Sequence, residues 1–261
     1  MATNSSVTKI MVQPLGGSTA IIGIGGLRIV VDPTFDPPGE SEPGHPARMT
    51  GSALNIEQIG KMDVALVSHD QHPDNLDASG RALLTRTPVV LTTTPGAGRL
   101  GHDARGLDPW DRVELERPDG GTLRVTAVPA QHGPVGAEEQ SGVVVGFVLE
   151  ADDCPTVYVS GDNASIDVVQ DIADRVTHVD IAVLFVGAAA VPALWNGAPL
   201  TLTSDEAAVA ARILGARAAV PVHCEGWTHY TQGSAAVAEA FAAAGLTSVL
   251  SVVAPGATVT L

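Results

Sequence analysis

Residue types that bind metal ions recur in this chain at the ends of predicted strands. His69, His132 and His223 each follow an apolar run directly or within a few residues, and Asp162 holds the same position after another run. Loops at strand ends bring side chains from separate strands into one cleft. Neutral imidazoles and carboxylates are the ligands that a zinc-like ion takes at about 2.0–2.2 Å. The series therefore predicts a metal site assembled from four separate loops.

The densest group of such residues is the segment 68–77, which places two His and three Asp residues directly after the apolar run Val64–Val67. Burying this many titratable groups without a cation is costly. The alternative interpretation is a solvated acidic turn that caps a helix. We favour the metal interpretation because potential ligands recur at strand ends further along the chain.

The last strand-end histidine has further polar neighbours. His223 ends the run Ala218–Val222, and Glu225 and His229 follow within six residues. Either could form hydrogen bonds to a ligand or donate a proton. Each could equally cap local backbone or pack near Trp227. The sequence leaves both interpretations open.

The hydrophobic pattern predicts strands, then strand–helix units, then the same again. The predicted strands are Val7–Val12, Thr19–Ile24, Leu27–Val31, Val64–Val67, Val89–Thr92, Asp111–Leu115, Thr122–Val128, Gly142–Glu150, Thr156–Val159, Ile181–Val186 and Ala218–Val222, and Ser248–Val253 and Thr258–Leu261 close the chain. The predicted helices are Ser79–Thr85, Ile166–Arg175, Ser204–Leu214 and Gly233–Ala244. We predict an α/β fold, a four-layer αββα sandwich, forming a single domain over residues 1–261.

The charge and hydrophobicity of the sequence indicate which classes of partner to expect. The net charge is −15, from 14 Lys and Arg against 29 Asp and Glu, so few cations exist for the basic face of a nucleic-acid binder. The first 13 residues lack a signal-peptide pattern, and no apolar run reaches the roughly 18 residues of a membrane span. We expect a cytoplasmic protein with a small-molecule substrate, without nucleic-acid or membrane partners, and leave a homo-oligomer open.

Taken in order, these motifs resemble the metallo-β-lactamase superfamily. Its motif series is a His-x-His-x-Asp-His loop, a later His, a Gly-Asp pair and a final strand-end His. The resemblance extends from about residue 8 to 261 and is closest to the branch that includes L-ascorbate-6-phosphate lactonase. The segments that carry the branch resemblance are Val30–Pro33, Ser160–Asp162, Leu202–Ala207 and Pro221–His223. It implies the αββα fold and a metal-dependent hydrolase.

The first motif departs from the family pattern, because one residue is inserted between His69 and His72. Read forward from His69 without a gap, the third position of the motif falls on Gln71. Read backward from its end, the third position is His72, the fifth is Asp74, and Asn75 replaces the sixth-position His. We prefer the second register because it keeps more ligands.

In this register the resemblance implies ligands for one or two divalent ions. The first ion would take His69, His72 and His132, the second Asp74 and His223, and Asp162 would bridge them. The number of ions stays open because Asn75 is a poor ligand compared with imidazole. The ligand types favour zinc, with manganese or iron as alternatives.

The resemblance also implies hydrolysis by a metal-bound hydroxide, since a bound cation lowers the pKa of water from 15.7 to about 7. Asp74 is the expected proton acceptor, and His229 could donate to the leaving group. An ester, lactone, amide or phosphoester of a small molecule is expected. An ester or lactone is favoured because the candidate loops offer only Arg48 as a cation. Trp195 and Trp227 are candidates for an apolar wall. The alternative is a non-catalytic ligand-binding protein with a degenerate metal site on the same fold.

Overall fold

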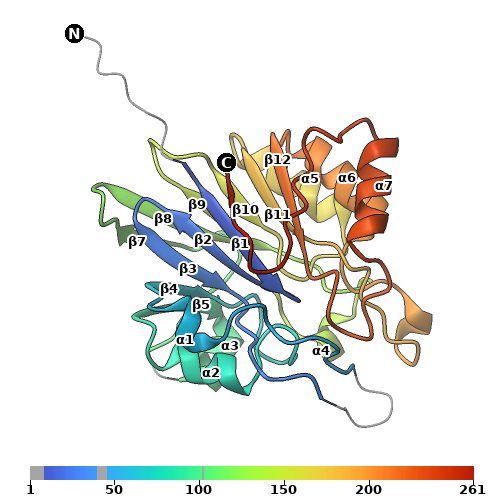
Figure 1. Cartoon of the computed structure of the whole chain (residues 1–261), viewed down its shortest axis with the longest axis horizontal. Coiled ribbons are helices and arrows are strands. Elements are labelled where there is room, and N and C mark those ends of the chain that lie inside the picture. The colour runs from blue at the N-terminus through green and yellow to red at the C-terminus, as the bar shows by residue number, and fades with distance from the viewer. Residues whose placement is uncertain (1–8, 40–45, 102) are drawn as a thin grey trace.

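The computed structural model describes residues 9–39, 46–101 and 103–261, and shows two β-sheets packed face to face between two groups of helices (Figure 1). Within these ranges the first sheet has seven strands, in the spatial order β13 (Val259–Thr260), β1 (Met11–Gly16), β2 (Thr19–Ile24), β3 (Leu27–Val31), β4 (Val64–Leu66), β5 (Val89–Thr93) and β6 (Arg105–Leu107). The second has six, in the order β12 (Ala218–Val222), β11 (Ile181–Phe185), β10 (Val157–Val159), β9 (Val145–Glu150), β8 (Thr122–Pro129) and β7 (Arg112–Glu116).

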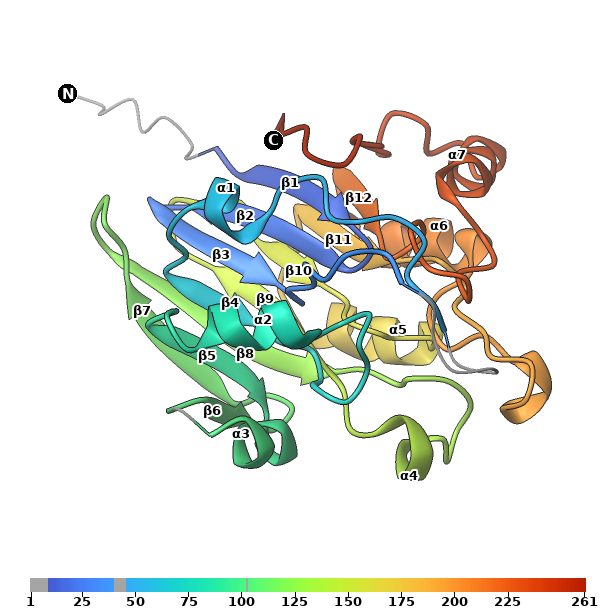
Figure 2. The ribbon, with the colours of Figure 1, turned by 60° about the horizontal axis from the view of Figure 1, so that its bottom comes forward.

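Helices cover the outer face of each sheet (Figures 1 and 2). The first sheet carries α1 (Ile56–Ile59), α2 (Ala78–Leu84) and α3 (Thr94–Leu100), and the second carries α5 (Ile166–Arg175), α6 (Ser204–Ile213) and α7 (Ser234–Ala243). Two short elements, α4 (Glu138–Ser141) and a 3₁₀ turn (Trp195–Gly197), lie in connecting loops. This arrangement confirms the predicted four-layer αββα fold.

The main core lies between the sheets and is built almost wholly from aliphatic side chains. Ile22 and Ile29 of the first sheet share one buried cluster with Phe147 and Val183 of the second. Strand residues alternate between this cluster and the helix-covered faces, which is why apolar residues fill both faces. Two further clusters hold the helices on the sheets.

The structure differs from the predicted elements at the two ends of the chain and in short internal elements that were not predicted, among them α1, α3, β6 and α4. The first strand is Met11–Gly16, not Val7–Val12, because the chain turns at Gly17 to pair with β2; residues 7 and 8 lie outside the described residues. Ser248–Val253 forms no strand and contributes a single bridge, from Leu250 to Ala219. The helix Thr94–Leu100 escaped prediction because its sequence, TPGAGRL, carries a Pro and two Gly in seven residues.

Strand direction explains where functional side chains gather. Strand β9 runs antiparallel to both β8 and β10, while β10, β11 and β12 are mutually parallel. The carboxyl ends of β8, β10 and β12 therefore lie along one edge of the second sheet. Strands β3 and β4 of the first sheet are also parallel, so their ends meet at one edge too. Side chains that follow these five strands can converge.

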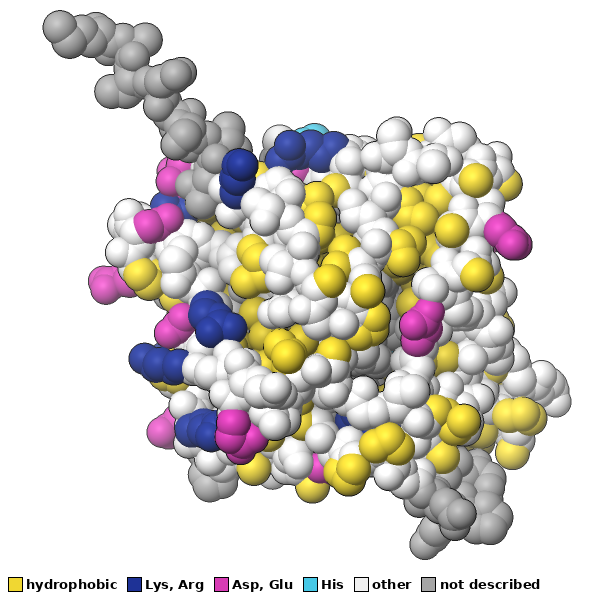
Figure 3. Space-filling model, viewed as in Figure 1, with side chains coloured by type: hydrophobic (Ala, Val, Ile, Leu, Met, Phe, Trp, Pro, Cys, Tyr) yellow, Lys and Arg dark blue, Asp and Glu magenta, His cyan; other side chains and the backbone are white. Residues whose placement is uncertain are grey.

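The helices and the surface charges can be compared with the expectation that no membrane or nucleic acid is a partner. Among the described residues, no helix is long and apolar enough to cross a bilayer. On the face shown in Figure 3, Lys and Arg side chains lie mainly on the left and are interleaved with acidic ones, without forming a continuous basic stripe. The cytoplasmic location and the lack of a nucleic-acid partner stay predictions.

Candidate metal centre

Three imidazoles and a carboxylate meet in the loops that follow β4, β8 and β10. His69 Nε2 lies 2.8 Å from His72 Nδ1, and His132 Nε2 lies 3.2 Å from the same atom. Asp162 Oδ2 is 3.5 Å from His132 Nε2. The donor atoms of all four residues lie within 4.8 Å of one another, and His72 alone of the four is partly exposed. Four potential ligands from three loops therefore converge on one point.

The hydrogen-bond partner of His132 fixes which ring nitrogen is free. Its Nδ1 lies 2.7 Å from the carbonyl oxygen of Leu200, which can only accept. Nδ1 therefore carries the proton, and Nε2 directs a lone pair into the centre.

A short relay fixes the tautomer of His69 in the same way. Ser68 Oγ donates to Asp32 Oδ2 at 2.6 Å, so it must accept from His69 Nδ1 at 3.0 Å. His69 Nε2 is then also unprotonated. The unprotonated Nε2 atoms of His69 and His132 both face His72 Nδ1. A single proton on that atom cannot satisfy both of them well, whereas a cation among the three nitrogens can. The residues present therefore fit a metal ion.

A second group of potential ligands adjoins the first and shares Asp162. His223 Nε2 lies 3.1 Å from Asp74 Oδ2 and 3.3 Å from Asp162 Oδ1, and it is aligned for a hydrogen bond with neither. His229 Nε2 and the Tyr230 hydroxyl reach Asp74 Oδ2 at 3.0 and 3.1 Å. Asp74 therefore joins the histidines that follow β12 to the His69 loop.

Asn75 lies behind both groups. Its Nδ2 donates to Asp32 Oδ2 and to Asp162 Oδ1, each at 3.0 Å. Its Oδ1 is buried without a hydrogen-bond partner among the described residues. The amide therefore links two carboxylates.

Burial controls the charge of these groups. Burial lowers the pKa of His69 and of His132, and neighbouring imidazoles lower both further, so both rings are neutral at neutral pH, as metal ligands must be. Burial by itself would raise the pKa of Asp74, but the adjacent His223 and His229 imidazoles outweigh it and hold that pKa well below its usual range. Burial raises the pKa of Asp32 to about 7 against the hydrogen bonds from Ser68 and Asn75.

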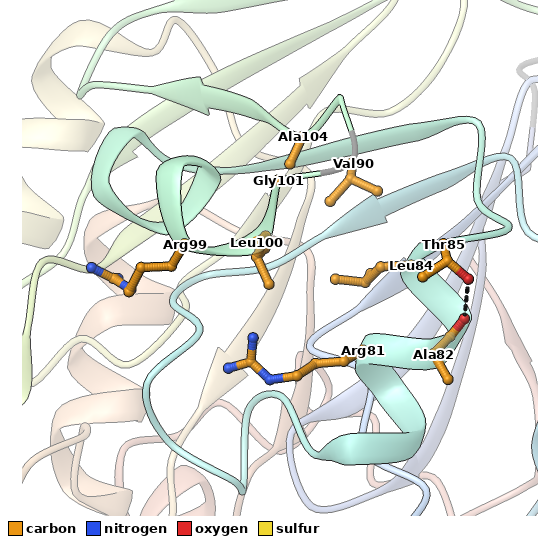
Figure 4. Close-up of a pocket in the computed structure, with 9 residues that line it drawn as sticks. All are labelled: Arg81, Ala82, Leu84, Thr85, Val90, Arg99, Leu100, Gly101 and Ala104. Carbon is orange, nitrogen blue, oxygen red and sulfur yellow. Dashed lines mark hydrogen bonds between the residues drawn. The ribbon is translucent and has the colours of Figure 1, made fainter.

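The loop that carries His69 and His72 is anchored from outside. The Arg99 guanidinium donates twice to the Asp70 carboxylate, and Arg81 donates to the Asp70 carbonyl oxygen. Figure 4 shows Arg81 extending from α2 toward α3, beside a cavity of about 300 Å³ whose described lining contains no His, Asp or Glu. At the other end of the loop, Asp77 caps α2 by accepting from the Gly80 N–H at 2.7 Å.

Two glycines allow the other ligand loops to approach closely. Gly161, just before Asp162, has φ +57°, and a Cβ there would lie 2.7 Å from the Val145 carbonyl oxygen. A Cβ on Gly187 would lie 2.1 Å from the carbonyl oxygen of His223. His223 itself has φ +57°, an uncommon conformation that is often found at functional sites.

A cavity of about 440 Å³ opens onto the centre. His72, Asp74, His132, Asp162 and His229 line its floor. Its wall is largely apolar and includes Ala189, Val191, Leu194, Trp195 and Leu200. None of its described lining residues is a Lys or Arg, and the undescribed segment 40–45 contains neither in its sequence.

The structure brings together the six predicted metal ligands and His229. The six predicted metal ligands form the two adjoining groups, and His229 contacts Asp74. Of the other candidates, only Trp195 lines the cavity at this site. Glu225 is exposed and accepts from Ser234, while Arg48 is buried and donates to Asp77. Trp195 lines the cavity but Trp227 does not.

The sequence analysis missed three residues that support the site. Ser68 and Asp32 orient His69, and Tyr230 donates to Asp74. Asp32 carries a signal like that of Asp162, since each carboxylate follows an apolar strand directly or within three residues. Tyr230 offers no comparable signal, because only the turn after β12 brings it to Asp74.

Ser68→Ala is expected to lower metal affinity about 10- to 100-fold, because outer partners of ligating histidines contribute that much. The change removes the oxygen that holds the His69 proton on Nδ1. Competition with a chromogenic chelator measures the affinity. Ser204→Ala is the matched control, since Ser204 Oγ is buried without a partner among the described residues. Equal affinity in both variants would contradict the relay.

The amino-acid sequence is similar to those of known proteins. The family model described as "Beta-lactamase superfamily domain" matches residues 27–224. A metal-dependent hydrolase of Nitratidesulfovibrio vulgaris is 27% identical over 219 residues, covering 80% of this chain and 77% of the relative. Another, from Anaeromyxobacter sp. (strain K), is 25% identical over 213 residues, covering 76% of this chain and 68% of the relative.

Solved structures share the fold at lower identity. Isothiocyanate hydrolase from Delia radicum gut bacteria superposes with a TM-score of 0.79 at 19% identity, covering 95% of this chain and 98% of that one. A metallo hydrolase from Ignicoccus hospitalis gives a TM-score of 0.72 at 20% identity, covering 97% and 98%. These likenesses concern the fold alone.

Proposed function

This chain belongs to the metallo-β-lactamase superfamily and is a metal-dependent hydrolase, and we propose that it cleaves an uncharged ester or lactone of a small molecule at the centre described above. The cavity is the observation that carries the proposal. The converging His and Asp donors lie on its floor, its wall is largely apolar, and its described lining contains no Lys or Arg. A single domain over residues 1–261 and a possible homo-oligomer stay predictions.

We propose His69, His72, His132 and Asp162 as the primary metal ligands. Three imidazole nitrogens with one carboxylate oxygen suit zinc best, with manganese or iron as alternatives. A bound divalent ion supplies Lewis-acid activation of water, whose pKa falls to about 7. The neighbouring group, Asp74, Asp162 and His223, has the donor types for a second ion.

The residues beside the primary ligands would handle protons. Asp74 lines the cavity floor, and its lowered pKa keeps the carboxylate ionised at neutral pH, so it can orient the attacking water and accept a proton. His229 lines the same floor and contacts Asp74 Oδ2 at 3.0 Å. It is therefore placed to pass a proton to a leaving oxygen.

The apolar lining of the cavity favours a substrate without strong charge. A phosphorylated substrate would need Arg or Lys beside its phosphate, and the described lining has neither. Arg48, the one Lys or Arg of the candidate loops, is 7% exposed and donates to Asp77, Thr34 and Thr50. The resemblance to the L-ascorbate-6-phosphate lactonase branch is therefore not extended to a phosphorylated substrate.

Trp195→Ala is expected to raise KM about 5- to 30-fold, with kcat little changed. The indole contributes apolar contact to bound substrate and lies away from the reacting atoms, and one or two kcal/mol of lost binding gives this factor. Steady-state kinetics on the best ester or lactone measures it. Trp110→Ala is the control, since Trp110 stacks on Arg175 and does not line the cavity. An unchanged KM in Trp195→Ala would place the substrate elsewhere.

A hydrolysis screen tests the function directly. Metal-free protein and protein reloaded with zinc, manganese or iron would be assayed against matched neutral and phosphorylated lactones, esters, amides and phosphodiesters, with an isothiocyanate included because a structural neighbour hydrolyses one. We expect metal-dependent turnover of neutral esters or lactones. Exclusive turnover of phosphorylated substrates would contradict the proposed class.

A further inference from the structure

The two groups of donors differ in how many ligands each can offer. The primary group has four, of which three are imidazoles. The second group has three, and one of them, Asp162, is shared. A zinc-like ion prefers at least four ligands, so the second position depends on what its neighbours contribute. The nearest candidates are Asn75, His229 and Tyr230.

The Asn75 amide turns its NH₂ group, which cannot bind a metal ion, toward the carboxylates of this second position. Its two nearest partners are Asp32 Oδ2, which already accepts from Ser68 Oγ, and the carboxylate oxygen Asp162 Oδ1. The amide must therefore present Nδ2, whose hydrogens are donated and whose nitrogen does not ligate metals. Turning the amide round would set its oxygen about 3 Å from both carboxylate oxygens, which repel it. Asp162 Oδ1 is thereby already engaged.

Asp74 is engaged in the same way. Its Oδ2 lies 3.0 Å from His229 Nε2 and 3.1 Å from the Tyr230 hydroxyl. Two donors occupy the two lone pairs of that oxygen. Only His223 Nε2 remains unaligned with any acceptor. An ion at the second position that used these two oxygens, Asp74 Oδ2 and Asp162 Oδ1, would compete with the hydrogen bonds they already accept.

We infer that this chain retains one tightly bound metal ion, held by His69, His72, His132 and Asp162, and that the Asn75 amide takes the place of a second tightly bound cation by bridging Asp32 and Asp162. The inference rests on the proposed function, because it assumes the primary site. The sequence left open whether one or two ions bind, and this inference chooses one. Asp74 and His223 then act through hydrogen bonds and protons rather than as permanent ligands.

The test is metal content after exhaustive dialysis of the zinc-loaded full chain, measured by elemental analysis and native mass spectrometry. The wild type is expected to retain one zinc per chain. Asn75→His, which replaces the bridging amide with an imidazole, is expected to retain two. Asn75→Asp, nearly isosteric, also adds a ligand and keeps the test open if the histidine variant misfolds. Asn196→His is the control, because it adds an imidazole at an exposed site and should retain one.

Manganese-loaded protein gives a second readout. Two ions about 3.5–4 Å apart are exchange-coupled, so the Asn75→His spectrum should show coupling in electron paramagnetic resonance while the wild type shows isolated ions. Two retained ions in the wild type would overturn the inference alone. One retained ion in both folded Asn75 variants would also overturn it. A wild type that retains none would instead overturn the primary site on which the proposed function rests.

Discussion

Asp162→Ala is expected to lower kcat/KM by about 10³-fold or more and to release the metal ion on dialysis. The variant removes the carboxylate that faces His132 Nε2 at 3.5 Å and His223 Nε2 at 3.3 Å, the only residue common to both donor groups. Metal activation contributes several kcal/mol to transition-state stabilisation, and about 4 kcal/mol corresponds to 10³ in rate. Elemental analysis and kinetics on one preparation measure both effects.

The control for this prediction is Asp167→Ala, because Asp167 is exposed in the first turn of α5, a few residues downstream. It should keep full metal and full activity. Circular dichroism should show both variants folded, since Asp162 follows β10 and contributes no backbone pairing. Full metal and activity in Asp162→Ala would mean that the ligand set is wrong.

Asp74→Asn is expected to lower kcat about 10²- to 10⁴-fold while the protein keeps its ion. Asp74 is not among the four donors of the primary group, so the ion should stay. The amide, however, cannot accept a proton as the carboxylate does, and general-base contributions have this size. Single-turnover kinetics on metal-loaded protein, with metal content determined alongside, separate the two quantities.

Tyr230→Phe separates the effect of one hydrogen bond to Asp74 from the loss of its carboxylate. It removes one hydrogen bond to Asp74 Oδ2 at 3.1 Å and leaves the carboxylate in place. It should therefore lower kcat less than Asp74→Asn does, about tenfold, which corresponds to a loss of about 1.5 kcal/mol from one hydrogen bond to a charged group. A kcat for Asp74→Asn equal to that of Tyr230→Phe would show that Asp74 takes no part in the proton transfer.

The sequence could predict the layers and the ligand loops because both depend on local patterns. Apolar runs such as Val64–Val67 and Ala218–Val222 mark buried strands, and polar residues directly after them mark the site edge. Parallel pairing then places His69, after β4, at one edge of the first sheet and His223, after β12, at one edge of the second. These inferences need only hydrophobic periodicity and the rules of sheet pairing.

The sequence could not predict contacts that depend on the exact path of loops. The Asn75 amide bridges Asp32 and Asp162, which are 43 and 87 residues away, and no spacing rule signals this. Tyr230 reaches Asp74 because of the turn after β12. Arg48 could be noted as a cation, but only the packed structure shows that it is held by Asp77. Short helices such as α3 also depend on tertiary contacts.

The centre can be tested most directly by X-ray diffraction from crystals of the zinc-loaded protein, with data collected on both sides of the zinc absorption edge. The account predicts one dominant anomalous peak about 2.0–2.2 Å from His69 Nε2, His72 Nδ1 and His132 Nε2, with Asp162 completing the set. A map with no peak among these atoms, or with the dominant peak elsewhere in the molecule, would contradict it.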